Sequence, residues 1–305
     1  IKGDGSIRTI SNNKDKNALF TVPKGITLTL DNNITLNGND KDASLVFVQG
    51  GSLVMRTGST ASGARGVGVH VGDGSFIMQG GAISGNSGGG VYVGGGSFTM
   101  SDGSISGNTA SGRGGGVFVG GGSFTLEGGA INGNRANDGG GGGVFVGGGS
   151  FTLEGGIING NRANDGMGDG GIYVGRGSFT MLDGTVSGNA YYDDYALGSH
   201  NGGGGVCVYY FGSFTMEGGA ISGNTAYAGG GVCVSGSGTF TKQSGGIIYG
   251  SNASDVLKNT ATSGGSHGHA VYVDVDTSPA KKRDSTAGAG VTLDSAKSGS
   301  SGGWE

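Results

Sequence analysis

Proline and cysteine are nearly absent from this sequence, and charged residues are few. The 305 residues include 2 prolines and 2 cysteines, and Lys, Arg, Asp and Glu together make up 13%. Two cysteines are too few for a disulfide framework. A net charge of -4 without clustered Lys and Arg argues against nucleic acid as a partner. No hydrophobic run approaches the roughly 18 residues of a membrane span, so we expect no membrane insertion by this chain.

Glycine is abundant instead, with 77 residues. Collagen is excluded because the glycines follow no every-third spacing and proline is scarce. A disordered linker is excluded because hydrophobic residues make up 34% and recur in fixed short patterns such as VYV and SFTM. The composition therefore predicts a folded chain with glycine at its turns.

A glycine-rich unit repeats along the chain, and residues 90–108 show it best, with the apolar runs VYV, SFTM and SIS separated by glycine-rich corners. Its large apolar residue recurs every 22 to 35 residues, at Leu53, Phe76, Phe98, Phe124, Phe151, Phe179, Phe214 and Phe240. Such short runs with a period of two are typical of strands. The repeat predicts an all-β, right-handed, single-stranded parallel β-helix, a three-sheet solenoid of about ten coils.

The alternation also predicts which side chains face the core. In SFTM the Phe and the Met point inward, and in VYV the two valines do. The middle column of VYV is predicted to point outward: His70, Tyr92, Phe118, Phe145, Tyr173, Cys207, Cys233 and Tyr272. The asparagine that closes each unit predicts an amide ladder at one corner: Asn86, Asn108, Asn134, Asn161, Asn189 and Asn224.

The organisation is one solenoid with two ends. Residues 1–25 are predicted to form an N-terminal cap, 26–275 the β-helix repeats, and 276–305 a C-terminal cap or tail. Unit length varies between the closing asparagine and the next glycines, and the longest insert is Ala190–Gly204. One corner therefore carries loops, where repeat proteins usually place recognition. A second copy of this chain is also a candidate partner.

The units GGGVYVGGGSFTM and EGGAISGNTA resemble the glycine-rich repeats of bacterial β-helix surface proteins, and they are similar to polymorphic outer-membrane autotransporter passengers. The resemblance covers roughly residues 26–275. It includes GGAI at Gly80–Ile83, Gly128–Ile131 and Gly218–Ile221, although Ile stands where those passengers have the Phe of FxxN. It implies an extracellular or cell-surface location and a role as an adhesive scaffold. It supplies no catalytic residues.

An aromatic cluster is the first candidate ligand site. The members from the long insert and its surroundings are Tyr191, Tyr192, Asp193, Asp194, Tyr195, His200, Tyr209, Tyr210, Phe211 and Tyr227. Tyrosine rings beside carboxylates suit a glycan or a protein on a host or neighbouring cell. The alternative is that the loop covers its own hydrophobic patch.

A carboxylate column is a second candidate, for calcium. It consists of Asp102, Glu127, Glu154, Asp183 and Glu217, which follow SFTM at the next corner. Stacked carboxylates repel unless a cation binds them, and Ca²⁺ prefers oxygen ligands. The alternative is a solvated turn, since polar residues before glycines suit turns. Apart from Ca²⁺ at this column, we expect no cofactor.

Two other functions stay open beside the adhesive scaffold. A polysaccharide lyase or hydrolase would need an acid–base constellation, and Asp193, Asp194 and His200 form the one cluster of that type. An ice-binding face would use the outward Ser and Thr of each SFT segment, such as Ser123 and Thr125. Cys207 and Cys233 occupy equivalent positions in neighbouring coils, so both a disulfide and free thiols are compatible with the repeat.

Overall fold

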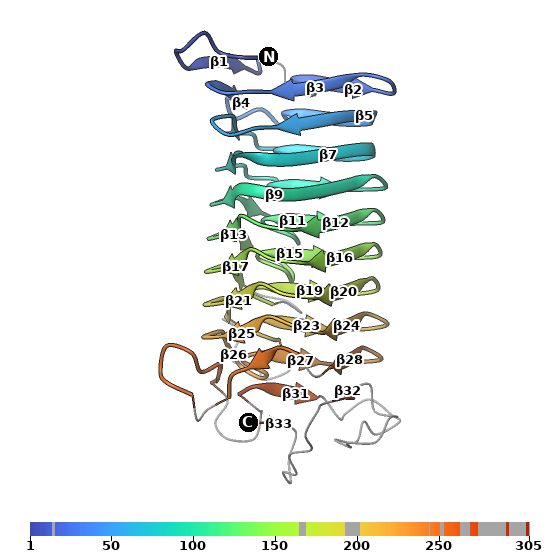
Figure 1. Cartoon of the computed structure of the whole chain (residues 1–305), viewed down its shortest axis with the longest axis vertical. Coiled ribbons are helices and arrows are strands. Elements are labelled where there is room, and N and C mark those ends of the chain that lie inside the picture. The colour runs from blue at the N-terminus through green and yellow to red at the C-terminus, as the bar shows by residue number, and fades with distance from the viewer. Residues whose placement is uncertain are drawn as a thin grey trace.

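The computed structural model describes residues 1–13, 16–164, 169–192, 202–243, 245–250, 253–262 and 269–273, with strand backbone at 291–292 and 303–304. These residues form strands and turns stacked as coils along one long axis, with the two termini near opposite ends (Figure 1). The described part contains no helix with the length and apolarity that a membrane span requires.

Each coil contributes three strands to one continuous set of ladders. A representative coil has β11 (Val117–Val119), a glycine corner, β12 (Ser123–Leu126), a second corner and β13 (Ala130–Asn132). Each strand pairs in parallel with the equivalent strand one coil further on, as Phe124 pairs with Phe151. The prediction of a parallel β-helix is therefore confirmed.

The strands group by ladder. The first ladder contains β2 (Phe20–Pro23), β5 (Val46–Met55), β7 (Val69–Ser84), β8 (Val91–Val93), β11, β15 (Val144–Val146), β19 (Ile172–Val174), β23 (Val206–Val208), β27 (Val232–Val234) and β31 (Val271–Val273). The second adds β3 (Thr27–Leu30), β9 (Ser97–Ser106), β12, β16 (Ser150–Leu153), β20 (Ser178–Met181), β24 (Ser213–Met216), β28 (Thr239–Lys242) and β32 (Val291–Thr292). The third adds β1 (Arg8–Ser11), β4 (Ile34–Asn37), β6 (Thr60–Ser62), β13, β17 (Ile157–Asn159), β21 (Thr185–Ser187), β25 (Ala220–Ser222) and β29 (Ile247–Ile248). The long strands β5, β7 and β9 each pass from one ladder into the next.

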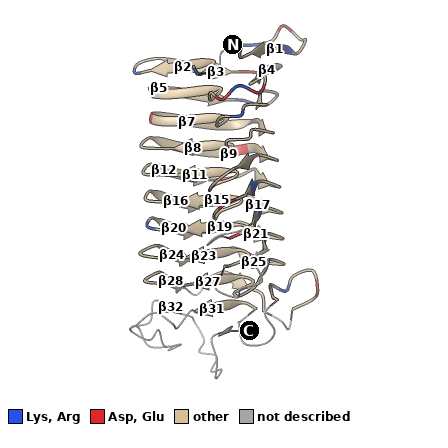
Figure 2. Cartoon of the chain, turned by 180° about the vertical axis from the view of Figure 1, so that it is seen from behind, with Lys and Arg blue, Asp and Glu red and all other residues tan. Residues whose placement is uncertain are grey.

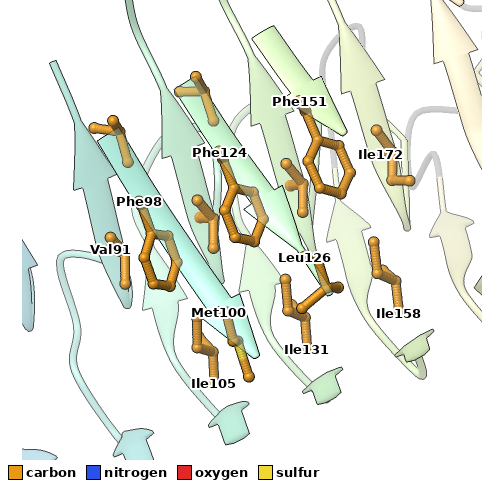
Figure 3. Close-up of a cluster of buried hydrophobic side chains, with 14 of the residues drawn as sticks. Val91, Phe98, Met100, Ile105, Phe124, Leu126, Ile131, Phe151, Ile158 and Ile172 are labelled. Atoms are coloured by element: carbon orange, nitrogen blue, oxygen red, sulfur yellow. The ribbon is translucent and has the colours of Figure 1, made fainter. Parts of the chain in front are cut away.

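The core is a single apolar column inside the coils, in which equivalent side chains stack along the axis (Figure 3). The largest members are phenylalanines of the second ladder, and the Phe124 ring lies 4.7 Å from that of Phe98 and 4.8 Å from that of Phe151. These three rings are 1% exposed. The column begins at Leu28 and Leu53 and ends at Phe240, which makes nine coils, and β32 pairs with the last, close to the predicted ten. The inward facing of Phe, Met, Val and Ile is confirmed.

The closing asparagines form the predicted amide ladder. Asn134 Nδ2 donates to Asn161 Oδ1 at 3.0 Å and to the Ile105 carbonyl at 2.9 Å. The backbone N–H and Nδ2 of Asn108 both donate to Asn134 Oδ1. The same pattern runs from Asn86 to Asn259, one coil beyond the predicted members. Because these amides are buried and fully bonded, they fix one corner of every coil.

A fourth short ladder follows the asparagines, and the sequence did not predict it. Its members are β10 (Thr109–Ala110), β14 (Arg135–Ala136), β18 (Arg162–Asn164), β22 (Ala190–Tyr192), β26 (Thr225–Ala226) and β30 (Thr260–Ala261). Ala136, Ala163, Tyr191 and Ala226 form a small apolar cluster there. The first residues of the inserts are therefore paired strand. The sequence predicts them as loop, because strands of two or three residues between variable inserts carry no clear periodic signal.

Paired strands also lie within both predicted end segments. β2 pairs with β5, and β1 pairs with β4, so the ladders begin before residue 26. At the other end, β33 (Gly303–Trp304) pairs antiparallel with β31, the last strand of the first ladder. This pairing places part of the predicted C-terminal cap against the final coil.

Candidate aromatic groove

The outward residues of the first ladder form a row of rings, which we call the aromatic row. It runs through Phe47, His70, Tyr92, Phe118, Phe145 and Tyr173 and continues through Tyr209 to Tyr210. Successive ring centroids lie 4.3 to 6.4 Å apart. The spacing follows from the parallel register, because equivalent residues of neighbouring coils lie about 4.8 Å apart.

This column points away from the main core, as predicted, but part of it is buried. Phe145 is 4% exposed and Tyr173 5%, whereas Tyr92 and Phe118 are half-buried. Together with Cys207, Ala228, Cys233 and Tyr272 the buried members form a second apolar cluster outside the main core. The glycine-rich inserts lie against it, since a Cβ at Gly140 would come within 2.6 Å of the Tyr173 ring.

Glycine at the following corner leaves room for these rings. A Cβ at Gly147 would lie 3.0 Å from Phe145 Cε1, and one at Gly175 would lie 3.3 Å from Tyr173 Cε1. Neither glycine has a left-handed backbone. The first glycine of each GGG corner is therefore needed for the space beside the ring rather than for the turn.

A groove of about 700 Å³ opens along this row. Its lining combines rings, corner glycines and two arginines: Tyr92, Phe118, Phe145, Tyr173, Tyr210, Gly94, Gly120, Gly121, Gly147, Gly175, Arg113 and Arg176. Its volume lies within the range of roughly 300–1,000 Å³ that is usual for small-ligand sites. The groove thus offers partly exposed aromatic surface at regular steps along the solenoid.

Tyr210 closes one end of the groove in an unusual conformation. Its φ is 50°, in the left-handed region, and its side chain is 46% exposed. It lies in a tight turn in which Gly212 N donates to the Tyr209 carbonyl at 2.9 Å. Non-glycine residues in this conformation cost of order 1–3 kcal/mol and cluster at ligand-binding sites. Most other coils place glycines at this corner.

A buried polar cluster lies beside the groove floor. Asp169 Oδ1 accepts a hydrogen bond from Gly203 N, and Oδ2 is buried without a partner in the described structure. Burial raises the pKa of Asp169 well above its usual range. Hydrogen bonding to Cys233, together with burial, raises the pKa of Cys207. Cys207 and Cys233 are not joined by a disulfide. Burial also raises the pKa of Tyr173.

The predicted aromatic cluster divides into two groups. Tyr209 and Tyr210 join the aromatic row, with ring centroids 4.3 Å apart, and Phe211 beside them is 72% exposed. Tyr191 is buried in the fourth ladder, so it supports the fold, and Tyr192 there packs under the Arg162 guanidinium at 4.0 Å. Tyr227 follows the alanine of the same ladder in the next coil and is 36% exposed. Asp193, Asp194, Tyr195 and His200 lie outside the described residues.

The five carboxylates of the predicted column do not all occupy the same position in their coils. Glu127, Glu154 and Glu217 directly follow the Met or Leu of their strands, whereas Asp102 and Asp183 come one residue later. The backbone N–H groups of Gly103 and Gly184 donate to these two aspartates at 2.7 and 2.8 Å, as in a local turn. All five side chains are exposed. Within the described residues no three His, Cys, Asp or Glu side chains are grouped closely enough to hold a metal ion.

The groove residues that sequence reasoning missed are Tyr92, Phe118, Phe145, Tyr173, Arg113 and Arg176. The signal was present, since six consecutive coils carry an aromatic or imidazole ring at this outward position. An ordinary solvated face carries scattered apolar residues, whereas six consecutive outward rings are unusual and indicate a binding surface.

The stacked coils define a parallel β-helical solenoid, and comparison with known proteins supports this fold. The chain belongs to the family of right-handed beta helix regions, whose model matches residues 44–199. This match also confirms the predicted handedness. Neither the curated proteins nor the solved structures include a match to the chain.

Proposed function

We propose that this chain is an extracellular adhesive scaffold, secreted or on a bacterial surface, that binds a glycan in the aromatic groove. The observation that carries the proposal is the aromatic row, which opens into the groove at Tyr92, Phe118 and Tyr210. The resemblance of the repeats to bacterial surface passengers supports the location. The rigid stack of coils supports the role of a scaffold.

A glycan suits the groove better than a protein does. Tyrosine and phenylalanine rings offer flat apolar area, and tyrosine adds a hydroxyl for hydrogen bonding. The groove volume of about 700 Å³ fits a small or chain-like ligand. A stable protein interface usually needs about 800 Å² from each partner. The steps of about 5 Å between rings favour a ligand that also repeats along its length.

Binding rather than hydrolysis is the chemistry that the lining supports. Most glycoside hydrolases use two carboxyl groups that flank the scissile bond. The groove lining within the described chain consists of rings, glycines and two guanidinium groups. We therefore propose binding without turnover, and release of reducing sugar ends from a bound glycan would contradict that.

A glycan array on the purified chain tests the proposal directly. The Tyr92→Ala, Tyr210→Ala double variant should lose at least about tenfold in affinity for the glycan that binds best, because stacking surface is removed. The Glu127→Gln, Glu154→Gln variant is the matched control, since these exposed carboxylates lie outside the groove lining. Binding that the tyrosine variant retains, or binding only to proteins, would contradict the proposal.

A second candidate function, ice binding, rests on the outer face of the second ladder. A rank of threonines pairs in register across six coils, at Thr99, Thr125, Thr152, Thr180, Thr215 and Thr241. A parallel rank two residues earlier consists of five serines and Thr239. Such an array has regular spacing in two directions. Thermal hysteresis that is lost in Thr152→Lys and kept in Asn159→Lys, on the third ladder, would support it. A wild-type chain without thermal hysteresis would exclude ice binding.

A further inference from the structure

We infer that the glycan bound in the aromatic groove is acidic, and that Arg113 and Arg176 bind its carboxylate or sulfate groups. This inference rests on the proposed function and specifies its ligand. Both arginines line the groove and are exposed. They approach it from different elements, Arg113 from the loop between β10 and β11 and Arg176 from the corner between β19 and β20.

Each guanidinium is held against a ring of the aromatic row. Arg113 Cζ lies 5.2 Å from the Phe145 centroid, and Arg176 Cζ lies 5.9 Å from the Tyr210 centroid. Stacking on a ring orients a guanidinium while its N–H groups stay available for a planar anion. None of the ion pairs found in the described chain involves either arginine.

The charge of the groove contrasts with that of the whole chain. The chain carries a net charge of -4, and Figure 2 shows few charged residues along the stacked coils. Among the described residues that line the groove, two are positive and none is acidic. The nearby Asp169 is fully buried, and burial favours its neutral form. An anion in the groove would therefore meet two positive charges without a competing carboxylate.

Both arginines are departures from the repeat. Arg176 stands where the preceding coils have the middle glycine of GGG, namely Gly95, Gly121 and Gly148. Arg113 belongs to an insert that the coil before it lacks. The two cations that line the groove are therefore both additions to the repeat unit.

The positions of the two arginines also indicate the arrangement of the ligand. Phe145 and Tyr210 belong to coils that are two steps apart, or about 10 Å along the axis. Two cations stacked on rings that are two coils apart favour a linear chain with repeated acidic groups over a single terminal acid. The ligand should then lie along the solenoid axis.

The test compares oligosaccharides of matched length by isothermal titration calorimetry: a uronic acid oligomer, its carboxyl-reduced neutral form and a sulfated oligomer. We expect the wild-type chain to bind a charged form at least about tenfold more tightly than the neutral form, because hydrogen bonds to charged groups are strong. The Arg113→Gln, Arg176→Gln variant should bring the two affinities within about twofold to threefold of each other. The control is Arg135→Gln, an exposed arginine outside the groove lining that should keep the preference.

Two outcomes would overturn the inference, and they differ in what they mean for the proposed function. Equal affinity for acidic and neutral forms, with binding still lost in Tyr92→Ala, Tyr210→Ala, would leave a glycan-binding groove without charge recognition. No binding of any of the oligosaccharides would contradict both proposals. Preference that survives the double arginine variant would place the anion contact on other residues and overturn the inference. If the acidic oligomers bind more tightly than the neutral form, the tighter binder of the sulfated and the uronic acid oligomers shows which acid the arginines recognise.

Discussion

At the scale of single residues, the molecule combines uniform positions with a few exceptions. The buried asparagines and phenylalanines are nearly identical from coil to coil because each must match the residue above and below it. The exceptions are Asp169, whose buried carboxyl has an oxygen without a partner, and Tyr210, whose backbone is left-handed. Both lie at the groove or beside it. Residues whose local conformation or burial is unfavourable for stability most often lie at functional sites.

Asp169 should make stability depend on pH. Its folded pKa is raised by burial, so between the unfolded pKa near 4 and the folded value the folded chain holds more protons than the unfolded one. Stability should then fall as pH rises through that window. Asp169→Asn, which cannot ionise, should melt several degrees above the wild-type chain at pH 8, and the difference should shrink toward pH 4. Asp138→Asn, an exposed control, should show no such trend. A pH-independent difference would mean that burial of the charge is not the cause.

Tyr210→Gly should separate stability from binding. Glycine adopts a φ of 50° without the cost of about 1 kcal/mol or more that a left-handed tyrosine incurs. The variant should therefore be as stable as the wild-type chain or up to about 1 kcal/mol more stable in urea melts, despite the loss of a large ring. Its glycan affinity should nevertheless decrease. A clear loss of stability would show that the Tyr209–Tyr210 contact is a structural requirement.

At the scale of elements, the facing of each strand decides which substitutions the fold tolerates. Phe124→Ala removes a ring that stacks on both neighbours and should cost roughly 3–5 kcal/mol. Thr125→Ala, one residue further along β12 and facing outward, should change stability by less than about 1 kcal/mol. Denaturant melts of both variants provide the comparison, and similar losses would be incompatible with the observed facing.

The elements also show what the sequence could and could not predict. Period-two alternation identified the three main ladders and their inward residues, because the same pattern recurs in every coil. The fourth ladder was missed, since strands such as Arg135–Ala136 have two residues and no measurable period. The burial of Phe145 and Tyr173 was missed because it depends on which insert lies over them, and that is a tertiary contact. The groove arginines were missed for the same reason.

At the scale of the whole molecule, a solenoid is a sum of similar coils, and that property gives a test of both the fold and the groove. Removing residues 117–143 joins Gly116 to Val144. Val144 then takes the position of Val117, because Val117 pairs with Val144 and Asn134 bonds to Asn161 in the neighbouring coil. The remaining coils should stack in the same register, because each contacts mainly its neighbours. We expect a cooperative melt, a preserved β signal in circular dichroism, and a rod shorter by about 5 Å in solution scattering.

The same deletion should weaken the groove, and a second deletion supplies the control. Loss of 117–143 removes Phe118 and the corner glycines beside it, so glycan affinity should fall by about tenfold as stacking area is lost. Deletion of residues 69–90 joins Gly68 to Val91 and also removes one coil, yet it leaves every groove-lining residue in place. This control should fold and bind like the full chain. If both deletions fold and bind equally well, the ligand does not lie along the aromatic row; if the control also loses binding, the site extends toward the N-terminal coils at His70 and Phe47.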